Sequence, residues 1–173
     1  IKPILDNPDS QKTDIGFQSR LNVRSAEAVD LATINNIVID AITNWKLSER
    51  VYRLARHSLT YTETDLEFML ALIGENNEGR AIAAALWEPV SGGKNKNSSI
   101  LLHGIYVKSD YHGEGIGTYL VDYVSKRARK SGYDRMIVKA WRDAEEFFLR
   151  MGFYGSTNNE QERLYPRQLW RIV

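Results

Sequence analysis

The segment from residue 98 to residue 140 most constrains what this chain can fold into. An apolar run at residues 100–107 is followed by the glycine-rich turn His112-Gly113-Glu114-Gly115-Ile116-Gly117. After the turn, Gly132 ends a stretch in which apolar side chains recur at helical spacing, at Ile116, Leu120, Tyr123, Val124 and Ala128. A second apolar run at residues 136–140 follows. The order strand, helix, strand predicts two parallel strands joined by a crossover helix.

Other stretches add strands and helices around this unit. Apolar patterns predict strands at residues 17–23, 68–74, 80–87 and from 152 onward, with a hairpin between the second and third. Helical spacing predicts helices over residues 48–55, over 143–151 and, with Ser25 as its N-cap, over the stretch that holds Leu31, Ile34, Val38 and Ala41. Because a hairpin accompanies a parallel pair, we expect an α/β (α+β) fold with a mixed sheet.

Length and composition fit one folded unit. The chain has 173 residues, of which 43% are hydrophobic, and this suffices for one core. Residues 1–16 are polar and aperiodic, so we expect an N-terminal tail there and a single domain over residues 17–173. No apolar run approaches the roughly 20 residues that span a bilayer. We therefore expect a soluble, cytoplasmic protein without a membrane partner.

Charge and cysteine content exclude several kinds of chemistry. Lys plus Arg number 23 and Asp plus Glu 22, so the net charge of +1 provides no field to hold a nucleic acid. Without cysteine the chain has no thiolate metal site and no Cys nucleophile, and we expect no metal cofactor. The absence of cysteine is also compatible with a reducing cytosol. The oligomeric state is left open, and a homodimer is compatible with the sequence.

The glycine-rich turn is suited to binding a diphosphate. It lies where a strand ends and a helix begins, so backbone N–H groups without helical partners converge there. Glycine lets the backbone approach a phosphate, and the helix end adds roughly half a positive charge. Two other nucleotide motifs are not matched: Gly117-Thr118-Tyr119 lacks the Lys of the phosphate-binding loop, and residue 118 is not the third Gly of the dinucleotide fingerprint.

The same turn resembles the signature of the GNAT superfamily of acetyl-CoA-dependent N-acetyltransferases, Gln/Arg-x-x-Gly-x-Gly/Ala, with His112 in the first position. Residues 146–153 (EFFLRMGF) resemble the helix and strand that carry Phe-Tyr-x-x-x-Gly-Phe in that family. The clear resemblance covers residues 100–154. It implies a GNAT-like mixed sheet of six to seven strands, flanked by helices and splayed between the fourth and fifth strands, with acetyl-CoA as co-substrate.

The resemblance also implies which residues contact acetyl-CoA. Backbone groups of Ile105, Tyr106 and Val107 would hold the pantetheine arm. The diphosphate would lie on the turn and helix start formed by His112, Gly113, Glu114, Gly115, Ile116, Gly117 and Thr118, with the side chain of Glu114 facing solvent. Phe148 falls where the family often has a Tyr that acts as a general acid.

The chain departs from the family pattern at the catalytic positions. Phe148 has no proton to give, and Leu101 stands where some relatives have a Glu base. Strand alternation would place Leu101, His103, Ile105 and Val107 on one face. We therefore expect His103 in the cleft as the general base, for which the alternative is a buried, hydrogen-bonded strand residue.

Two further side chains are candidates for proton transfer. Glu88 is the second choice for the base. Tyr154 is a candidate acid, although packing or a hydrogen bond that satisfies its hydroxyl is the favoured alternative. Together with the turn, these residues predict an N-acetyltransferase that moves an acetyl group directly from acetyl-CoA to a primary amine of a small molecule or peptide. The alternative is a non-catalytic acyl-CoA-binding or regulatory module, because Phe148 and Leu101 replace groups that often catalyse.

Overall fold

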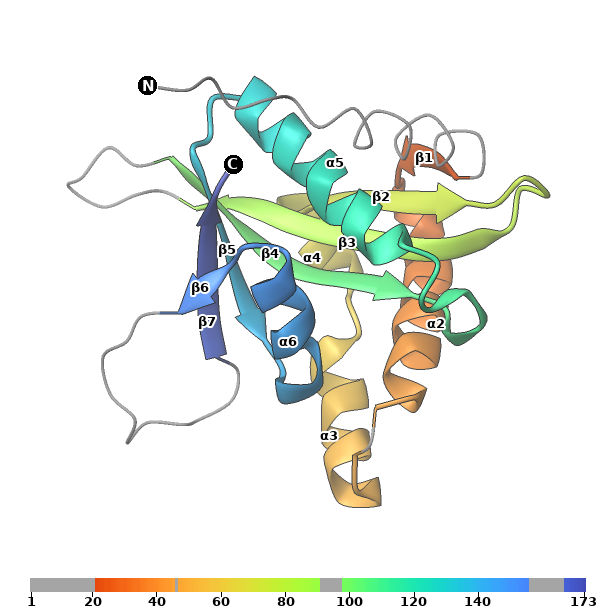
Figure 1. The fold of residues 1–173 in the computed structure, drawn as a ribbon. Helices are drawn as coiled ribbons and strands as arrows, with labels where there is room; N and C mark the ends of the chain where they lie inside the picture. The colour runs from red at the N-terminus through yellow and green to blue at the C-terminus, as the bar shows by residue number, and fades with distance from the viewer. Residues whose placement is uncertain (1–20, 46, 91–97, 156–166) are drawn as a thin grey trace, which may run out of the picture.

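The sheet of the protein is mixed and open. A computed structural model of the chain describes residues 21–45, 47–90, 98–155 and 167–173. Within these residues seven strands form one sheet in the order β1-β2-β3-β4-β5-β7-β6 (Figure 1). The parallel pair is β4 with β5, and every other pair of neighbours is antiparallel, which confirms the predicted mixed sheet. The strands are β1 Asn22–Ser25, β2 Leu70–Glu75, β3 Ala81–Val90, β4 Ser99–Val107, β5 Arg135–Ala140, β6 Tyr154–Gly155 and β7 Arg167–Ile172.

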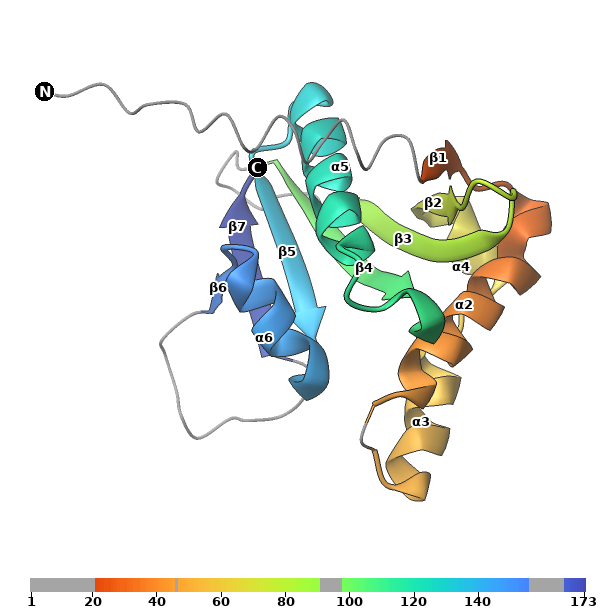
Figure 2. The ribbon, with the colours of Figure 1, turned by 45° about the vertical axis from the view of Figure 1, so that its right-hand side comes forward.

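Helices cover both faces of the sheet. Figures 1 and 2 show α5 and α6 on one face and α2 on the other. The crossover helix α5 connects β4 to the parallel strand β5, as the apolar pattern of residues 98–140 predicts. The described helical segments are η1 Ala28–Asp30, α2 Leu31–Thr43, α3 Glu49–Leu59, α4 Glu63–Phe68, η2 Ser109–Tyr111, α5 Ile116–Lys130 and α6 Arg142–Arg150.

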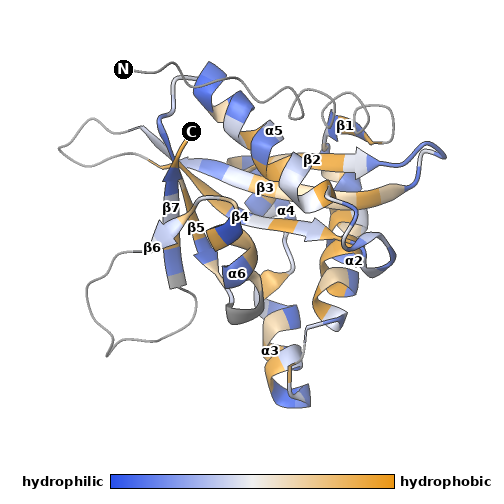
Figure 3. Cartoon of the chain, in the orientation of Figure 1, coloured by the Kyte–Doolittle hydropathy of each residue, from blue (hydrophilic) through white to orange (hydrophobic). Residues whose placement is uncertain are grey.

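Each face of the sheet has its own buried side chains. Val121 and Val124 of α5 pack with Phe148 of α6 against the central strands on one face. On the opposite face Ile34 and Val38 of α2 pack against the same strands. Figure 3 shows hydrophobic residues in the central strands and in α2, whereas the last turns of α5 are hydrophilic. The sheet is thus the middle of three layers.

Strands β4 and β5 separate halfway along β4. Their pairing joins residues 99–102 of β4 to residues 135–138 of β5. Beyond Leu102, β4 continues to Val107 with β3 as its partner on the other edge. The backbone groups of residues 103–107 that point toward β5 therefore have no partner on that strand. The splayed sheet that the family resemblance implies is confirmed.

A bulge interrupts β4 at the point where the strands separate. Leu86 of β3 lies opposite Gly104, but the next residue, Trp87, lies opposite Leu102. His103 is therefore an extra residue in the ladder, which is what defines a β-bulge.

The bulge changes which side chains of β4 share a face. Leu102 before the bulge and Ile105 after it both pack on the α5 side of the sheet. The predicted alternation from Leu101 through His103 to Ile105 and Val107 is therefore wrong, because an inserted residue reverses the order of faces. Leu101 and His103 lie on the face of the sheet that packs against α2, but away from the part of that face that α2 covers.

Two smaller predictions are also wrong. Ser25 does not cap the first long helix, because it lies at the end of β1 and η1 intervenes before α2. Residue 68 belongs to the short helix α4 rather than to a strand, so β2 begins only at Leu70. The expected N-terminal tail at residues 1–16 lies outside the described residues.

Candidate active site

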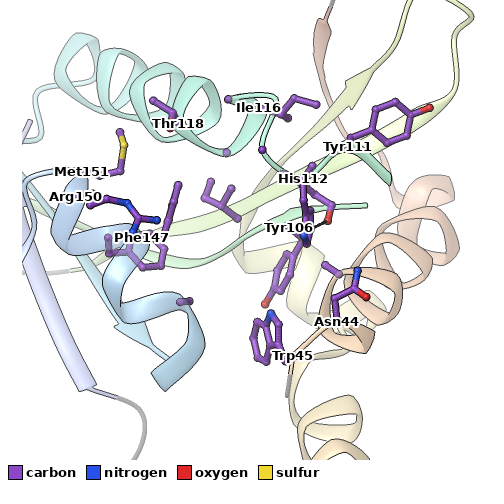
Figure 4. A pocket seen from close by; sticks show the side chains of 18 residues that line it. Asn44, Trp45, Tyr106, Tyr111, His112, Ile116, Thr118, Phe147, Arg150 and Met151 are labelled. Carbon is purple, nitrogen blue, oxygen red and sulfur yellow. Dashed lines mark hydrogen bonds between the residues drawn. The ribbon is translucent and has the colours of Figure 1, made fainter. Parts of the chain in front are cut away.

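A pocket opens where β4 and β5 separate. Its volume is about 730 Å³, and its walls are the end of α2, residues 105–107 of β4, the turn before α5, the first turn of α5 and one side of α6. Figure 4 shows side chains from these elements around the pocket, including Trp45, Tyr106, His112 and Phe147. The pocket thus joins the unpaired half of β4 to the start of a long helix.

The turn between β4 and α5 presents backbone N–H groups to this pocket. Gly113 and Gly115 have φ angles of 81° and 82°, a conformation that residues with a Cβ resist. The first backbone bond of α5 runs from the N–H of Tyr119 to the carbonyl oxygen of Gly115, at 3.0 Å. The N–H groups of the residues between these two have no partner within the helix. With the helix dipole, unpaired N–H groups of this kind are suited to binding an anion.

Two side chains fix the turn to its surroundings. Nε2 of His112 donates a hydrogen bond to the carbonyl oxygen of Val107 at 2.7 Å, which ties the turn to the end of β4. Oδ1 of Asp40 on α2 accepts hydrogen bonds from the N–H and the hydroxyl of Ser109, at 2.6 and 2.9 Å. These bonds hold the backbone donors in place before a ligand arrives, which lowers the ordering cost of binding.

Helix α6 approaches the start of α5 closely. A Cβ placed on Gly117 would lie 3.3 Å from Cζ of Phe147, so the last glycine of the turn makes room for an aromatic ring. Phe147 and its neighbour Phe148 both line the pocket. Their rings contact each other edge to face, with centroids 5.1 Å apart. The wall formed by α6 is therefore apolar near the turn.

Ten of the eleven residues predicted to contact the cofactor line this one pocket. The eleventh, Glu114, is exposed and is not among the described lining residues, in keeping with a side chain that faces solvent. The ten are Ile105, Tyr106, Val107, His112, Gly113, Gly115, Ile116, Gly117, Thr118 and Phe148.

The two candidate bases form a pair outside the pocket. Nε2 of His103 lies 3.0 Å from Oε1 of Glu88, and the two side chains are 23% and 32% exposed. Neither residue is among the described lining residues. The bulge turns His103 to the opposite face of β4 from Ile105, so the structure corrects the side of the sheet on which His103 was expected. The pair lies beside the point where β4 and β5 separate.

Tyr154 is not brought to the pocket. It lies on β6 at the far edge of the sheet, with β7 and β5 between it and β4. Its ring contacts the ring of Trp170 edge to face, with centroids 4.2 Å apart. The structure therefore supports the packing role rather than the role of an acid.

Two tyrosine hydroxyls meet on the α2 side of β4. Oη of Tyr106 lies 3.1 Å from Oη of Tyr61, whose backbone N–H and carbonyl oxygen both bond to the side-chain amide of Asn35 at 2.8 Å. Burial raises the pKa of Tyr106 to about 12, and burial likewise raises the pKa of Tyr61 well above its usual value. Both phenols therefore keep their protons at neutral pH.

Most side chains on the α6 wall of the pocket were not predicted from the sequence to line it. Ala144, Phe147, Phe148 and Met151 line the pocket with spacings of three, one and three residues, which mark one face of a helix. This helical spacing is the feature of the sequence from which the wall could have been predicted. Arg150, on the same face, interrupts the apolar pattern with a charge.

The described part of the chain holds neither a membrane-spanning helix nor a cluster of metal-binding side chains. No helix there is long and apolar enough to cross a membrane. Nor do three or more His, Cys, Asp or Glu side chains gather there in a way that could hold a metal ion.

Comparison with known proteins identifies one family. The family model described as "Acetyltransferase (GNAT) family" matches residues 39–153. N-acetyltransferase 8B of Rattus norvegicus is 31% identical over 109 residues, which are 61% of this chain and 45% of that protein. The chain thus matches less than half the length of this curated relative.

Solved structures share the fold. The "GCN5-Related N-acetyltransferase: Aminotransferase, Class-II" from Rhodopseudomonas palustris superposes with a TM-score of 0.70 at 23% identity, covering 90% of this chain and 97% of that one. PaiA N-acetyltransferase from Thermoplasma acidophilum, in complex with coenzyme A, has a TM-score of 0.70 at 15% identity and covers 88% and 99%.

Proposed function

The chain belongs to the acetyltransferase (GNAT) family, and on this premise we propose that it transfers an acetyl group directly from acetyl-CoA to a primary amine of a small molecule or peptide. The observation that carries the proposal is the pocket of about 730 Å³ that joins the start of α5 to the unpaired half of β4. The PaiA relative with the same fold was crystallised with coenzyme A, which supports acetyl-CoA as the ligand.

The residues of the pocket fit acetyl-CoA. A Cβ added to Gly113 would meet no heavy atom within 4 Å, so there is open space beside the N–H groups of the turn for a diphosphate. The backbone groups of residues 105–107 that point away from β3 have no partner on β5 and can bond the amides of the pantetheine arm, apart from the carbonyl oxygen of Val107, which accepts from His112. We assign the diphosphate to residues 112–118 and the arm to residues 105–107.

The acceptor amine must lose a proton before it reacts. Bound acetyl-CoA supplies an acetyl group activated as a thioester. A Lys-like amine has a pKa of ~10.4, so removing its proton at pH 7 costs about 4 to 5 kcal/mol. We assign this task to His103, because Nε2 donates to Glu88 and leaves Nδ1 as the acceptor of the proton.

We assign no strong general acid among the described residues. Phe148 has no titratable proton, and Tyr106, whose pKa burial raises to about 12, holds its proton too tightly to protonate a departing thiolate. The reaction tolerates this, because a thiol with a pKa of ~8.5 leaves readily as the thiolate. The backbone N–H of Ile105 or Tyr106, next to the bulge, is the donor that we assign to the carbonyl oxygen under attack.

Turnover with a panel of amines tests this function. The panel holds an amino acid, a polyamine, a peptide with a free N-terminus and a peptide with an internal Lys. We expect release of the coenzyme A thiol that depends on one class of amine, together with an equal amount of N-acetylated product. Acetyl-CoA at 100 times its Kd should also stabilise the fold by about 2.7 kcal/mol.

Two outcomes would contradict the proposal. Stabilisation by acetyl-CoA with no turnover across the panel would favour a non-catalytic acyl-CoA-binding module, the reading that Phe148 and Leu101 suggest. The absence of both stabilisation and turnover would exclude the enzyme and the binding module together.

A further inference from the structure

One wall of the pocket is a single face of α6. Phe147, Arg150 and Met151 line the pocket, and their spacing of three and four residues puts them on one side of a helix. The same face touches the start of α5, because Phe147 packs against Gly117. Arg150 lies one turn beyond Phe147 on this wall. Figure 4 shows its guanidinium extending from α6 toward the inside of the pocket.

Arg150 carries the only permanent positive charge among the described residues that line the pocket. In the glycine-rich turn Glu114 is acidic, and Nε2 of His112 already donates to Val107. The basic residues of α5 do not compensate, since they follow the first residue of that helix by ten or more positions, roughly 15 Å along its axis. These are Lys126, Arg127, Arg129 and Lys130, and none is among the described lining residues.

The present partner of Arg150 is easily exchanged. Nη1 of Arg150 lies 2.7 Å from Oε1 of Glu146, in a pair whose side chains are 65% and 82% exposed. Exposed pairs of this kind contribute little to stability. A phosphate offers several charged oxygens, and Arg binds such groups with two parallel bonds. The ion pair with Glu146 thus holds the guanidinium beside the pocket, and a ligand can replace Glu146 at little cost.

We propose that Arg150 binds a phosphate group of acetyl-CoA, and that it exchanges its bond to Glu146 for that phosphate when the pocket fills. The proposal rests on the proposed function, because it names the side chain that recognises the charged end of the same ligand. The chemistry is that of a phosphate ester, and acetyl-CoA offers two sources of it, the diphosphate and the 3′-phosphate. Together with the N–H groups of the turn, Arg150 then distinguishes acetyl-CoA from a thioester without phosphates.

Binding measured by isothermal titration tests the proposal. We expect Arg150→Gln to raise the Kd of acetyl-CoA by about tenfold or more, because it removes charge-assisted hydrogen bonds. Glu146→Gln should lower the Kd by about twofold, because it frees the guanidinium from a weak competing bond. The chain contains a matched control pair on α3, Arg53 with Glu49, at the same i,i+4 spacing and similarly exposed. Arg53→Gln and Glu49→Gln should leave the Kd unchanged.

Truncated ligands identify the phosphate. If Arg150 binds the 3′-phosphate, the penalty of Arg150→Gln disappears with 3′-dephospho-acetyl-CoA. If it binds the diphosphate, the penalty persists with that ligand and disappears only with S-acetylpantetheine. Either pattern supports the proposal. Added salt should weaken acetyl-CoA binding to the wild-type chain more than binding to Arg150→Gln, because screening acts on the charge that the variant lacks.

Three results separate the possible failures. Equal Kd values for the wild-type chain and Arg150→Gln would overturn the role of Arg150 and leave the proposed function intact. An equal loss of S-acetylpantetheine binding in Arg150→Gln would also overturn it, because that ligand has no phosphate to lose. No binding of acetyl-CoA to the wild-type chain would instead overturn the proposed function, and the role of Arg150 with it.

Discussion

Nε2 of His103 lies 3.0 Å from Oε1 of Glu88, on the face of β4 opposite to Ile105. The single extra residue of the bulge produces this arrangement, because it reverses the order of faces along the strand. A titratable pair is thus held at the point where β4 and β5 separate, next to the residues of the strand that line the pocket. A strand without the bulge would place His103 on the same face as Ile105.

Replacing His103 should remove proton acceptance without removing cofactor binding. We expect His103→Gln to lower kcat/KM by roughly 100-fold or more, as for the loss of a general base. The rise in kcat/KM with pH that depends on a neutral imidazole should disappear. The Kd of acetyl-CoA should stay the same, because His103 is not among the described lining residues.

His57 provides the matched control for that experiment. It is exposed in the last turn of α3, and His57→Gln should leave both kcat/KM and its pH profile unchanged. Glu88→Gln should lower kcat/KM less than His103→Gln does, because it removes the partner and keeps the base. An unaltered pH profile in His103→Gln would remove this residue from the mechanism.

A pair of glycines separates backbone strain from phosphate binding. Gly113 and Gly79 have φ angles of 81° and 72°, and a Cβ added to either would meet no heavy atom within 4 Å. Replacing each by Ala should therefore cost a similar ~1 to 2 kcal/mol of folding stability. We expect Gly113→Ala, in the turn, to raise the Kd of acetyl-CoA by about tenfold. Gly79→Ala, in the β2-β3 hairpin, should leave it unchanged, and an equal Kd in both variants would contradict the assignment of the turn.

The ring of Tyr106 requires a glycine at position 104. A Cβ on Gly104 would overlap the ring and hydroxyl of Tyr106, so Gly104→Ala must displace the ring whose hydroxyl bonds to Tyr61. We expect a loss of about 1 to 3 kcal/mol in urea unfolding. In a Tyr106→Ala background the same substitution should cost much less, because the obstacle is gone. Equal costs in both backgrounds would refute the steric explanation.

Asp30 should make folding stability depend on pH in the acid range. Two hydrogen bonds from Arg24, at 2.8 and 2.9 Å, lower the pKa of Asp30 from 3.8 to about 2. Because the folded state holds the charged form, Asp30 contributes about 2 kcal/mol above pH ~4, and this contribution is lost as the pH falls toward ~2. Asp30→Asn should therefore be destabilised at pH 7 but not at pH 2.

Urea unfolding at several pH values checks this expectation. The exposed pair of Arg53 with Glu49 is the control, and Glu49→Gln should change the free energy of unfolding by no more than about 0.5 kcal/mol at pH 7. A stability difference between the wild-type chain and Asp30→Asn that is the same at pH 7 and pH 2 would contradict the account.

The parts of the fold that repeat a short pattern were predictable from the sequence. The spacing of apolar residues predicts strand β4, the crossover helix α5 and strand β5. The glycines that precede α5 mark the turn at its start. Strand β7 was hidden, because Arg171 faces inward and its guanidinium bonds to Asp122 and to the carbonyl oxygen of Met151. An inward-facing charge breaks the alternation that marks a strand.

The missed features of the site have a common physical cause. The bulge at His103 depends on how β3 and β4 pair, and no local pattern records that pairing. Arg150 reaches the pocket because α6 packs against the start of α5, which is again a contact between distant segments. The glycine-rich turn before α5 was predictable from the sequence, whereas the side of the sheet on which His103 lies depends on how β3 and β4 pair.

A crystal structure of this chain with acetyl-CoA tests the central claim most directly. The account predicts the diphosphate on the N–H groups of residues 113–118 and the pantetheine arm along residues 105–107 of β4, in the gap beside β5. Coenzyme bound elsewhere on the chain, or an empty pocket at saturating acetyl-CoA, would contradict it.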